Sequence, residues 1–163
     1  IWSETERALC AHHPSNFFEK IITLNLCDPF FNELKQSNCE SQNNKVLRWA
    51  ELQINNDFAL GENLPLPNEY KNIANIAKNL IVIDKNCEED ELVSIVMRID
   101  FSRNNDLIIE LTSLPVFARN RNYILRLAKE INNFDFSFLG ETSSDKIEEE
   151  KIKIYRKIIN KSK

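Results

Sequence analysis

One stretch of the chain, residues 106–133, most constrains its fold. Its sequence, DLIIELTSLPVFARNRNYILRLAKEINN, predicts a short apolar helix, a corner marked by Pro115 and a longer amphipathic helix. Residues 21–56 carry a partial copy, in which IITLNLCDPFF matches IIELTSLPVF and KVLRWAELQINN matches YILRLAKEINN. Pro29 of the first copy corresponds to Pro115 of the second. Similarity at an interval of about 80 to 87 residues is typical of one or two units of a helical repeat array.

Length and composition predict one folded domain built mostly from helices. At 163 residues, with 42% hydrophobic and 28% charged residues, the chain is long enough to bury a core and too hydrophobic to be disordered. It contains two glycines, a residue that antiparallel β-proteins need in their turns and bulges. Its apolar runs are shorter than about 18 residues, so we expect no membrane span. Because the chain begins at Ile1, without an initiating Met or a signal peptide, we expect it to be a piece of a larger protein.

Start signals and apolar spacing predict a succession of helices. Ser3 followed by Glu6 is a capping box, and Asp28-Pro29 combines a capping carboxylate with a proline at the first helical position. The segment 61–67, GENLPLP, is the clearest break, because its two prolines resist helix formation. Short helices are therefore expected at residues 4–12, after Ser15 and after Pro29, and longer ones at 46–54, from Pro67 to about Ile81, at 88–102 and after Ser144.

Two further expectations concern the C-terminal part. The segment FDFSFLGETSSD, which follows Asn133, is expected to be irregular, with its aromatic side chains packed onto the preceding helices. In the closing helix Glu149 and Lys153 have the spacing of an ion pair one helical turn apart.

An α+β domain is the alternative fold. Residues 80–84, 92–101 and 107–112 are apolar runs that would serve as its strands. Periodicity alone leaves open whether 80–84 and 107–112 are helix or strand.

The predicted helices need one another. Each has an apolar stripe that a neighbour must cover, and helices of this length are stabilised mainly by packing. Stacking similar helical hairpins buries such stripes in one continuous core, as in an α-solenoid.

Residues 99–133 resemble an armadillo repeat. IDFSRNNDLIIELTSLPVF followed by NYILRLAKEINN has the order of that family: an asparagine-bearing turn, a short hydrophobic helix, a Leu-Pro corner and a long third helix. Asn104 and Asn105 stand where the family has a glycine, so the resemblance is armadillo- or HEAT-like.

The resemblance implies an all-α fold, a right-handed armadillo-like stack of helices forming a fragment of an α-solenoid. We expect a single helical-repeat domain over residues 1–163. Its parts would be a first repeat-like unit at 15–60, a second repeat region at 67–140 and a closing helix at 143–163.

A shorter similarity points to a nuclear protein. The segments 102–108, SRNNDLI, and 115–117, PVF, resemble the C-terminal core region of the ARID-bearing subunits of SWI/SNF-type chromatin remodellers. The similarity covers about twenty residues and implies a non-catalytic scaffold on which a nuclear complex is built.

Metal-binding and nucleophilic chemistry were considered for one cluster. Cys10, His12 and His13, with Cys27, are residue types that bind zinc, but zinc sites usually show paired ligands at regular spacing. We therefore favour a helix end with two exposed histidines and two buried thiols, with Cys27 inside an apolar helix. A small metal-binding or enzymatic domain using these four residues is the alternative.

The remaining motifs predict no enzyme. The acidic runs 88–91 and 148–150 lack the spacing of a calcium loop and suit solvated helix N-termini. With glycine only at 61 and 140, a glycine-rich phosphate-binding loop is excluded. We expect no catalytic residue, no metal, no cofactor and no small-molecule substrate.

The strongest local positive charge suggests a partner-binding face. Arginine and tyrosine are favoured at interface hot spots, whereas the alternative role of these residues is solubility and local pairing. The candidate residues are Arg103, Arg119, Arg121, Tyr123 and Arg126. The net charge of −4 and the flanking acids argue against direct binding of nucleic acid.

Together these features predict a non-catalytic scaffold that binds other protein subunits of a larger complex. Its specific version is the structural core of a nuclear chromatin-remodelling subunit involved in transcription regulation. The alternative is a cytoplasmic adaptor or regulatory armadillo domain.

Overall fold

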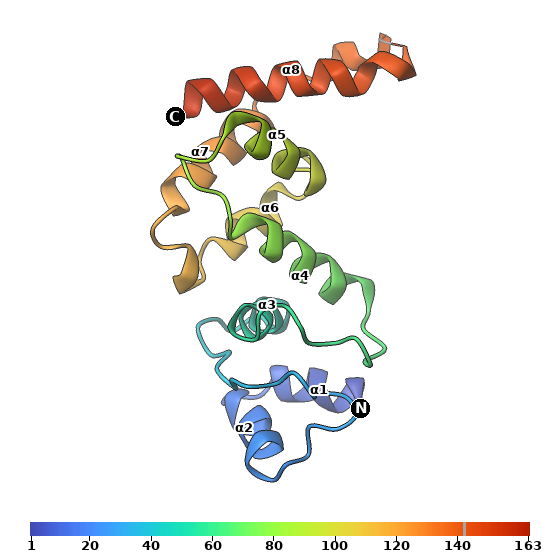
Figure 1. The fold of residues 1–163 in the computed structure, drawn as a ribbon, viewed down its shortest axis with the longest axis vertical. Coiled ribbons are helices and arrows are strands. Elements are labelled where there is room, and N and C mark those ends of the chain that lie inside the picture. Colours follow the sequence, from blue (N-terminus) through green and yellow to red (C-terminus); the bar gives the residue numbers. More distant parts are fainter. Residues whose placement is uncertain (142) are drawn as a thin grey trace. The chain divides into compact units, whose positions relative to one another are not determined.

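A computed structural model describes residues 1–141 and 143–163 of the chain. Over these residues it contains α-helices and two short 3-10 turns, and no strand (Figure 1). The all-α prediction is confirmed for the described residues. The α+β alternative is wrong, because 92–98 and 107–111 are helical and 81–84 form a turn. The chain folds as two compact units, Ile1–Lys78 and Asn79–Lys163.

The N-terminal unit is built around Trp49. It contains α1 (Trp2–Leu9), α2 (Ser15–Thr23), α3 (Lys45–Asn55) and most of α4 (Asn68–Leu80). The Trp49 ring is fully buried and lies edge-on to Trp2 at 5.3 Å between ring centroids, and Trp2 meets Tyr70 at 4.6 Å. Three large rings from α1, α3 and α4 therefore form the centre of this core.

Side chains at the two ends of α3 bond to the chain around it, including the long connection from α2. The Asn44 side chain caps α3 by accepting from the backbone N–H of Val46 (2.8 Å) and of Leu47 (3.3 Å). The Oδ1 atom of Asn56, just after α3, accepts from the backbone N–H of Lys35 (2.7 Å) and of Gln36 (2.9 Å). Because the connection is irregular, its backbone groups are hydrogen-bonded by side chains next to α3 instead of by a regular helix or sheet.

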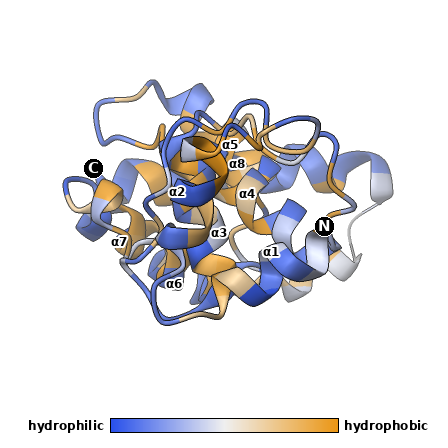
Figure 2. Cartoon of the chain, turned by 90° about the horizontal axis from the view of Figure 1, so that it is seen from below, coloured by the Kyte–Doolittle hydropathy of each residue, from blue (hydrophilic) through white to orange (hydrophobic). Residues whose placement is uncertain are grey.

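The C-terminal unit is a set of helices closed by a long last helix. It contains α5 (Glu89–Arg98), α6 (Asn105–Leu111), η1 (Pro115–Phe117), α7 (Arg121–Asn132), η2 (Ser137–Glu141) and α8 (Ser144–Ser162). In Figure 2 hydrophobic and hydrophilic residues alternate along the helices, as expected for amphipathic elements. The last helix packs against α5 and α7 and buries five residues, namely Ile154, Tyr155, Ile158, Ile159 and Ser162.

The stretch 106–133 folds as predicted. Residues 105–111 form the short helix α6, Pro115 begins the 3-10 turn η1, and residues 121–132 form the long helix α7. The helix expected over 88–102 is also present, but it ends at Arg98.

The first copy of this pattern does not fold in the same way. Pro29 begins no helix: α2 ends at Thr23 and the next helix starts at Lys45. Leu26, an apolar residue of this copy, is 60% exposed. The partners of this segment are distant in sequence: Asn63 Nδ2 donates to the carbonyl of Pro29 at 3.0 Å, and Asn56 Oδ1 accepts from the backbone of Lys35 and Gln36. The sequence match between the two copies therefore corresponds to the same structure, a helix, at α3 and α7.

Two local predictions are corrected. Helix α1 begins at Trp2, so Ser3 lies inside it and does not cap it. The burial of Trp2 against Trp49 explains why the helix extends this far. In α8 Lys153 pairs with Glu150 (2.7 Å), not with Glu149.

The described helices all lack the length or the apolar character that crossing a membrane requires.

Candidate functional site

The predicted arginine face divides into exposed and structural residues. Arg103, Arg119 and Arg121 are exposed. The Tyr123 side chain is 9% exposed, so it is a core residue. The Arg126 Nη1 atom donates to the backbone carbonyl of Ser162 at 3.1 Å, so this arginine satisfies a carbonyl in the last turn of α8.

Arg119 lies near an acid. The backbone N–H of Asn86 donates to Asp84 Oδ1 at 2.8 Å, and this bond, aided by the positive charge of Arg119, lowers the pKa of the Asp84 carboxyl. The charge of Arg119 is thus partly balanced within the fold, which leaves Arg103 and Arg121 as the more available cations of the set.

The cysteine and histidine cluster does not assemble as a metal site. His12 Nδ1 lies 3.0 Å from His13 Nε2, and His13 Nδ1 lies 3.8 Å from a carboxylate oxygen of Glu40. Both histidines are exposed, as expected. Cys10 is exposed rather than buried, and Cys27 lies half-buried in the turn after α2, not inside a helix. In the part of the chain that the structure describes, no three His, Cys, Asp or Glu residues are placed to hold a metal ion.

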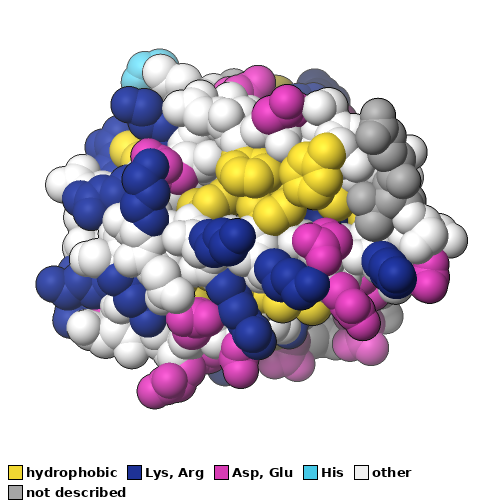
Figure 3. All heavy atoms as spheres, turned by 90° about the horizontal axis from the view of Figure 1, so that it is seen from above, with side chains coloured by type: hydrophobic (Ala, Val, Ile, Leu, Met, Phe, Trp, Pro, Cys, Tyr) yellow, Lys and Arg dark blue, Asp and Glu magenta, His cyan; other side chains and the backbone are white. Residues whose placement is uncertain are grey.

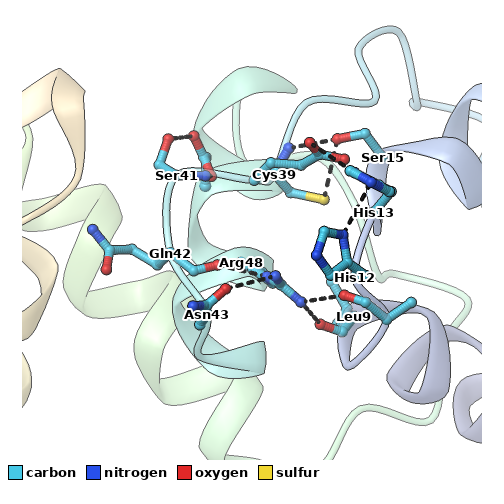
Figure 4. A network of polar contacts seen from close by, with 12 residues as sticks. Leu9, His12, His13, Ser15, Cys39, Ser41, Gln42, Asn43 and Arg48 are labelled. Carbon is cyan, nitrogen blue, oxygen red and sulfur yellow. Dashed lines mark hydrogen bonds and ion pairs between the residues drawn. The ribbon is translucent and has the colours of Figure 1, made fainter.

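A buried arginine organises the N-terminal unit, and sequence reasoning missed it. Figure 4 shows Arg48 of α3 between the end of α1 and the connection 42–43. Its side chain is 4% exposed. Its Nη1 atom donates to the carbonyls of Leu9 and Ala11, each at 2.7 Å, and its Nε atom donates to the carbonyl of Gln42 at 2.6 Å. The guanidinium is therefore used for packing rather than for a ligand.

Two neighbouring groups complete this polar network. Glu51 of α3 accepts from the backbone N–H of Ser41 at 3.0 Å and from the Ser41 hydroxyl (Figure 4). The backbone N–H of Cys39 donates to Ser15 Oγ at 3.2 Å. Burial raises the pKa of the Cys39 thiol to about 12, so this thiol stays protonated at neutral pH and is a poor nucleophile.

The C-terminal unit carries an exposed aromatic cluster. Phe134 and Phe138, on either side of the start of η2, are 38% and 43% exposed. The Phe134 ring lies 4.9 Å from the Phe136 ring and 6.4 Å from the Phe138 ring, and Phe136 in turn lies 5.9 Å from Tyr155 of α8. The cluster is thus anchored through Phe136 while two of its rings face solvent.

The exposure of Phe134 and Phe138 differs from the expectation that the aromatic side chains of this segment pack onto the preceding helices. The carboxylate of Asp135 accepts from the backbone N–H of Ser137 at 2.9 Å and closes a tight turn. That hydrogen bond lowers the pKa of Asp135. The Phe136 ring thus contacts both the exposed Phe134 ring and Tyr155 of α8.

Lysines of α8 border the exposed rings. Phe134 and Ile158 line a groove of about 500 Å³ together with Lys157 and Lys161. Lys161 Nζ forms an ion pair with Glu130 at 2.8 Å. Figure 3 shows a hydrophobic patch on this face with Lys and Arg side chains beside it. We call Phe134, Phe138, Lys157 and Lys161 the aromatic–lysine surface.

The aromatic–lysine surface combines exposed rings with neighbouring cations. It offers apolar rings, which gain free energy when covered, next to cations that attract an acidic group. Comparison of the chain with protein-family models, curated proteins and solved structures finds no match.

Proposed function

We propose that this chain is a non-catalytic scaffold domain that binds another protein. In this proposal the aromatic–lysine surface binds an acidic, partly apolar segment of the partner. The observation that carries the proposal is the exposure of Phe134 and Phe138 within a ring cluster anchored on α8. Clustered exposed aromatic residues next to cations have the composition of an interface hot spot.

The charges favour an acidic partner segment. Lys161 is already paired with Glu130, so Lys157 provides most of the uncompensated positive charge. A carboxylate placed beside Lys157 would gain a modest, salt-dependent attraction, while apolar side chains would cover the rings.

Protein is favoured over nucleic acid as the partner. The net charge of the chain is −4, and Glu130 and Glu150 lie among the lysines of this face. Nucleic-acid binding by electrostatics needs several cations that track the phosphates, and these acids interrupt such a row.

The proposal includes an armadillo-like arrangement of the helices. The order of α6, η1 and α7, together with the amphipathic helices of both units, supports it. Its specific version is a subunit core of a nuclear chromatin remodeller, and the alternative is a cytoplasmic adaptor domain. Arg103 and Arg121, with Arg119 of the same segment, form the second candidate face. Tyr123 and Arg126, which the sequence placed with them, serve the core and the last turn of α8.

A defined probe tests the surface. A fluorescent peptide that alternates Glu with Leu and Phe is titrated with the chain, and its anisotropy is compared with that of a peptide in which Lys replaces Glu. We expect binding of the acidic peptide alone, a loss of about tenfold or more in the double variant Phe134→Ser, Phe138→Ser, and a smaller loss in Lys157→Glu.

The matched control is the double variant Arg103→Glu, Arg121→Glu. Equal binding by the wild type and the phenylalanine variant would contradict the proposed surface. A loss confined to the arginine variant would assign binding to the second face. Preferential binding of single-stranded RNA or anionic vesicles over the acidic peptide would replace the proposed class of partner.

The nuclear version is tested by affinity purification from nuclear and cytoplasmic extracts, with mass spectrometry. Recovery of remodeller subunits by the wild type, lost in the phenylalanine double variant, would support it. Recovery of only cytoskeletal or transport proteins would support the adaptor alternative.

A further inference from the structure

We infer that the chain pairs with a second copy of itself through α5 and α8. In this dimer the two α8 helices lie against each other in antiparallel orientation, and so do the two α5 helices. The inference does not depend on the proposed function, because it uses a different groove of α8.

The groove in question has an apolar floor and a charged rim. Val93 and Met97 of α5 and Ile152 of α8 line a groove of about 510 Å³ between these helices. Met97 and Ile152 are half-buried, so part of each side chain remains to be covered. Asp90, Arg98, Glu148 and Arg156 line the same groove and are exposed.

The relative direction of α5 and α8 determines where these four charged residues lie along the groove. Arg156 Nη2 donates to Asp90 Oδ1 at 2.7 Å, and Lys163 Nζ donates to the carbonyl of Cys87 at 3.0 Å. Moving toward the C-terminus of α8 therefore corresponds to moving toward the N-terminus of α5, and the helices are antiparallel. Arg98 and Glu148 each lie eight residues, or roughly 12 Å, from the Asp90–Arg156 end.

Each end of the groove thus has one acid and one base. A two-fold axis that crosses both helices places Glu148 opposite Arg156 of the second copy and Asp90 opposite Arg98 of the second copy. All the opposing rim charges then differ in sign, and the apolar floors meet at the centre. A two-fold axis along the groove would instead set each α8 against α5 of the second copy, with Asp90 opposite Arg156 and Arg98 opposite Glu148, and the mixing experiment below distinguishes the two arrangements.

The wider charge pattern of α8 supports the antiparallel choice. Residues 144–151 contain four acidic and two basic residues, whereas 153–163 contain five basic residues and no acid. An antiparallel pair of α8 helices sets the acidic half of each helix against the basic half of the other, and Arg156 is the basic residue of this half that lines the groove.

The test is a charge exchange followed by sedimentation velocity of the full chain over a range of concentrations. We expect the wild type to associate from 19.1 kDa toward twice that mass, and salt to weaken this association. Glu148→Arg and Arg156→Glu place like charges opposite each other, so each variant alone should remain monomeric.

Mixing the two variants distinguishes this pairing from a general loss of association. In an equimolar mixture the changed side chains meet with opposite sign, and the unchanged Arg156 meets the unchanged Glu148. When one variant carries a fluorophore, the labelled chain in the mixture should therefore sediment as a dimer. Glu19→Arg, a matched charge change on α2, should associate like the wild type, and circular dichroism checks that each variant folds.

Several results would overturn the inference: a wild type that stays monomeric, single variants that associate like the wild type, or a mixture that remains monomeric. If Arg156→Glu does not fold, the same exchange is made with Asp90→Arg and Arg98→Asp. The double variant Phe134→Ser, Phe138→Ser should leave the dimer unchanged, so failure of this inference is distinguishable from failure of the proposed function.

Discussion

At the residue scale, single polar side chains hold the N-terminal unit together. Arg48 joins the end of α1 to the connection before α3 through carbonyl oxygens rather than a carboxylate. The carbonyls of Leu9 and Ala11 lie at the C-terminal end of α1, where the helix dipole favours a cation. Arginine suits this role because its planar fork donates in several fixed directions at once.

We expect Arg48→Ala to lower the free energy of unfolding by about 3 kcal/mol, because it removes charge-assisted hydrogen bonds and leaves buried carbonyls without a partner. Arg48→Lys should recover only a small part of this loss, since one ammonium cannot reach the same carbonyls. Urea unfolding followed by circular dichroism measures both variants. A lysine variant as stable as the wild type would show that charge alone, rather than geometry, matters at this position.

Glu6 predicts a pH-dependent contribution to stability. Lys45 Nζ donates to Glu6 Oε1 at 2.6 Å, and the Tyr70 hydroxyl donates to the same oxygen at 2.8 Å. These bonds lower the pKa of Glu6 below its ordinary value of 4.5. A carboxyl whose pKa is lowered by folding stabilises the fold above its unfolded pKa. That contribution is lost as the pH falls through the folded pKa.

Glu6→Gln should therefore lower the melting temperature at pH 7 and have progressively less effect below pH 4.5. Thermal unfolding of both proteins across this range tests it, with Glu19→Gln, exposed on α2, as the control. A difference that stays constant down to about pH 3 would assign the effect to packing instead of the carboxylate.

At the element scale, α8 provides the cover of the C-terminal unit. One side of its middle and last turns packs on α5 and α7, and its other sides line the two grooves. The helix thus covers the core of the C-terminal unit and is the main contributor to the surfaces proposed for binding.

Ile159 is 1% exposed, so Ile159→Ala should cost about 2–5 kcal/mol of unfolding free energy through lost burial and the cavity that remains. Asn160→Ala, an exposed neighbour on the same helix, should change stability by less than about 0.5 kcal/mol. Chemical denaturation of both variants makes the comparison. Similar small effects would mean that α8 is only loosely held.

At the scale of the whole molecule, the chain is two compact units, each with its own core. Leu127 of α7 is fully buried in the C-terminal unit. We expect Leu127→Ala to raise amide hydrogen exchange in α5, α7 and α8 far more than in α1 and α3, because local unfolding follows cooperative units. Exchange measured by mass spectrometry tests this. An equal rise in both units would show that the chain unfolds as one.

Local sequence patterns favoured an all-α fold and located most of the helices. Apolar spacing located the helices from α3 to α8, and the signals at Pro67 and Pro115 located two of their starts, because these are local properties of the chain. The same reasoning predicted that His12 and His13 are exposed.

Contacts between distant parts of the chain account for the long connection before α3, the role of Arg48 and the exposure of Phe134 and Phe138. Asp28-Pro29 has a strong helix signal, yet this segment packs against α3 in an irregular form that Asn56 stabilises. Arg48 has the local pattern of a solvent-exposed helix residue and is buried because carbonyls distant in sequence surround it. The physical reason is the same in each case: hydrogen bonds and burial depend on partners far along the chain, which local periodicity does not contain.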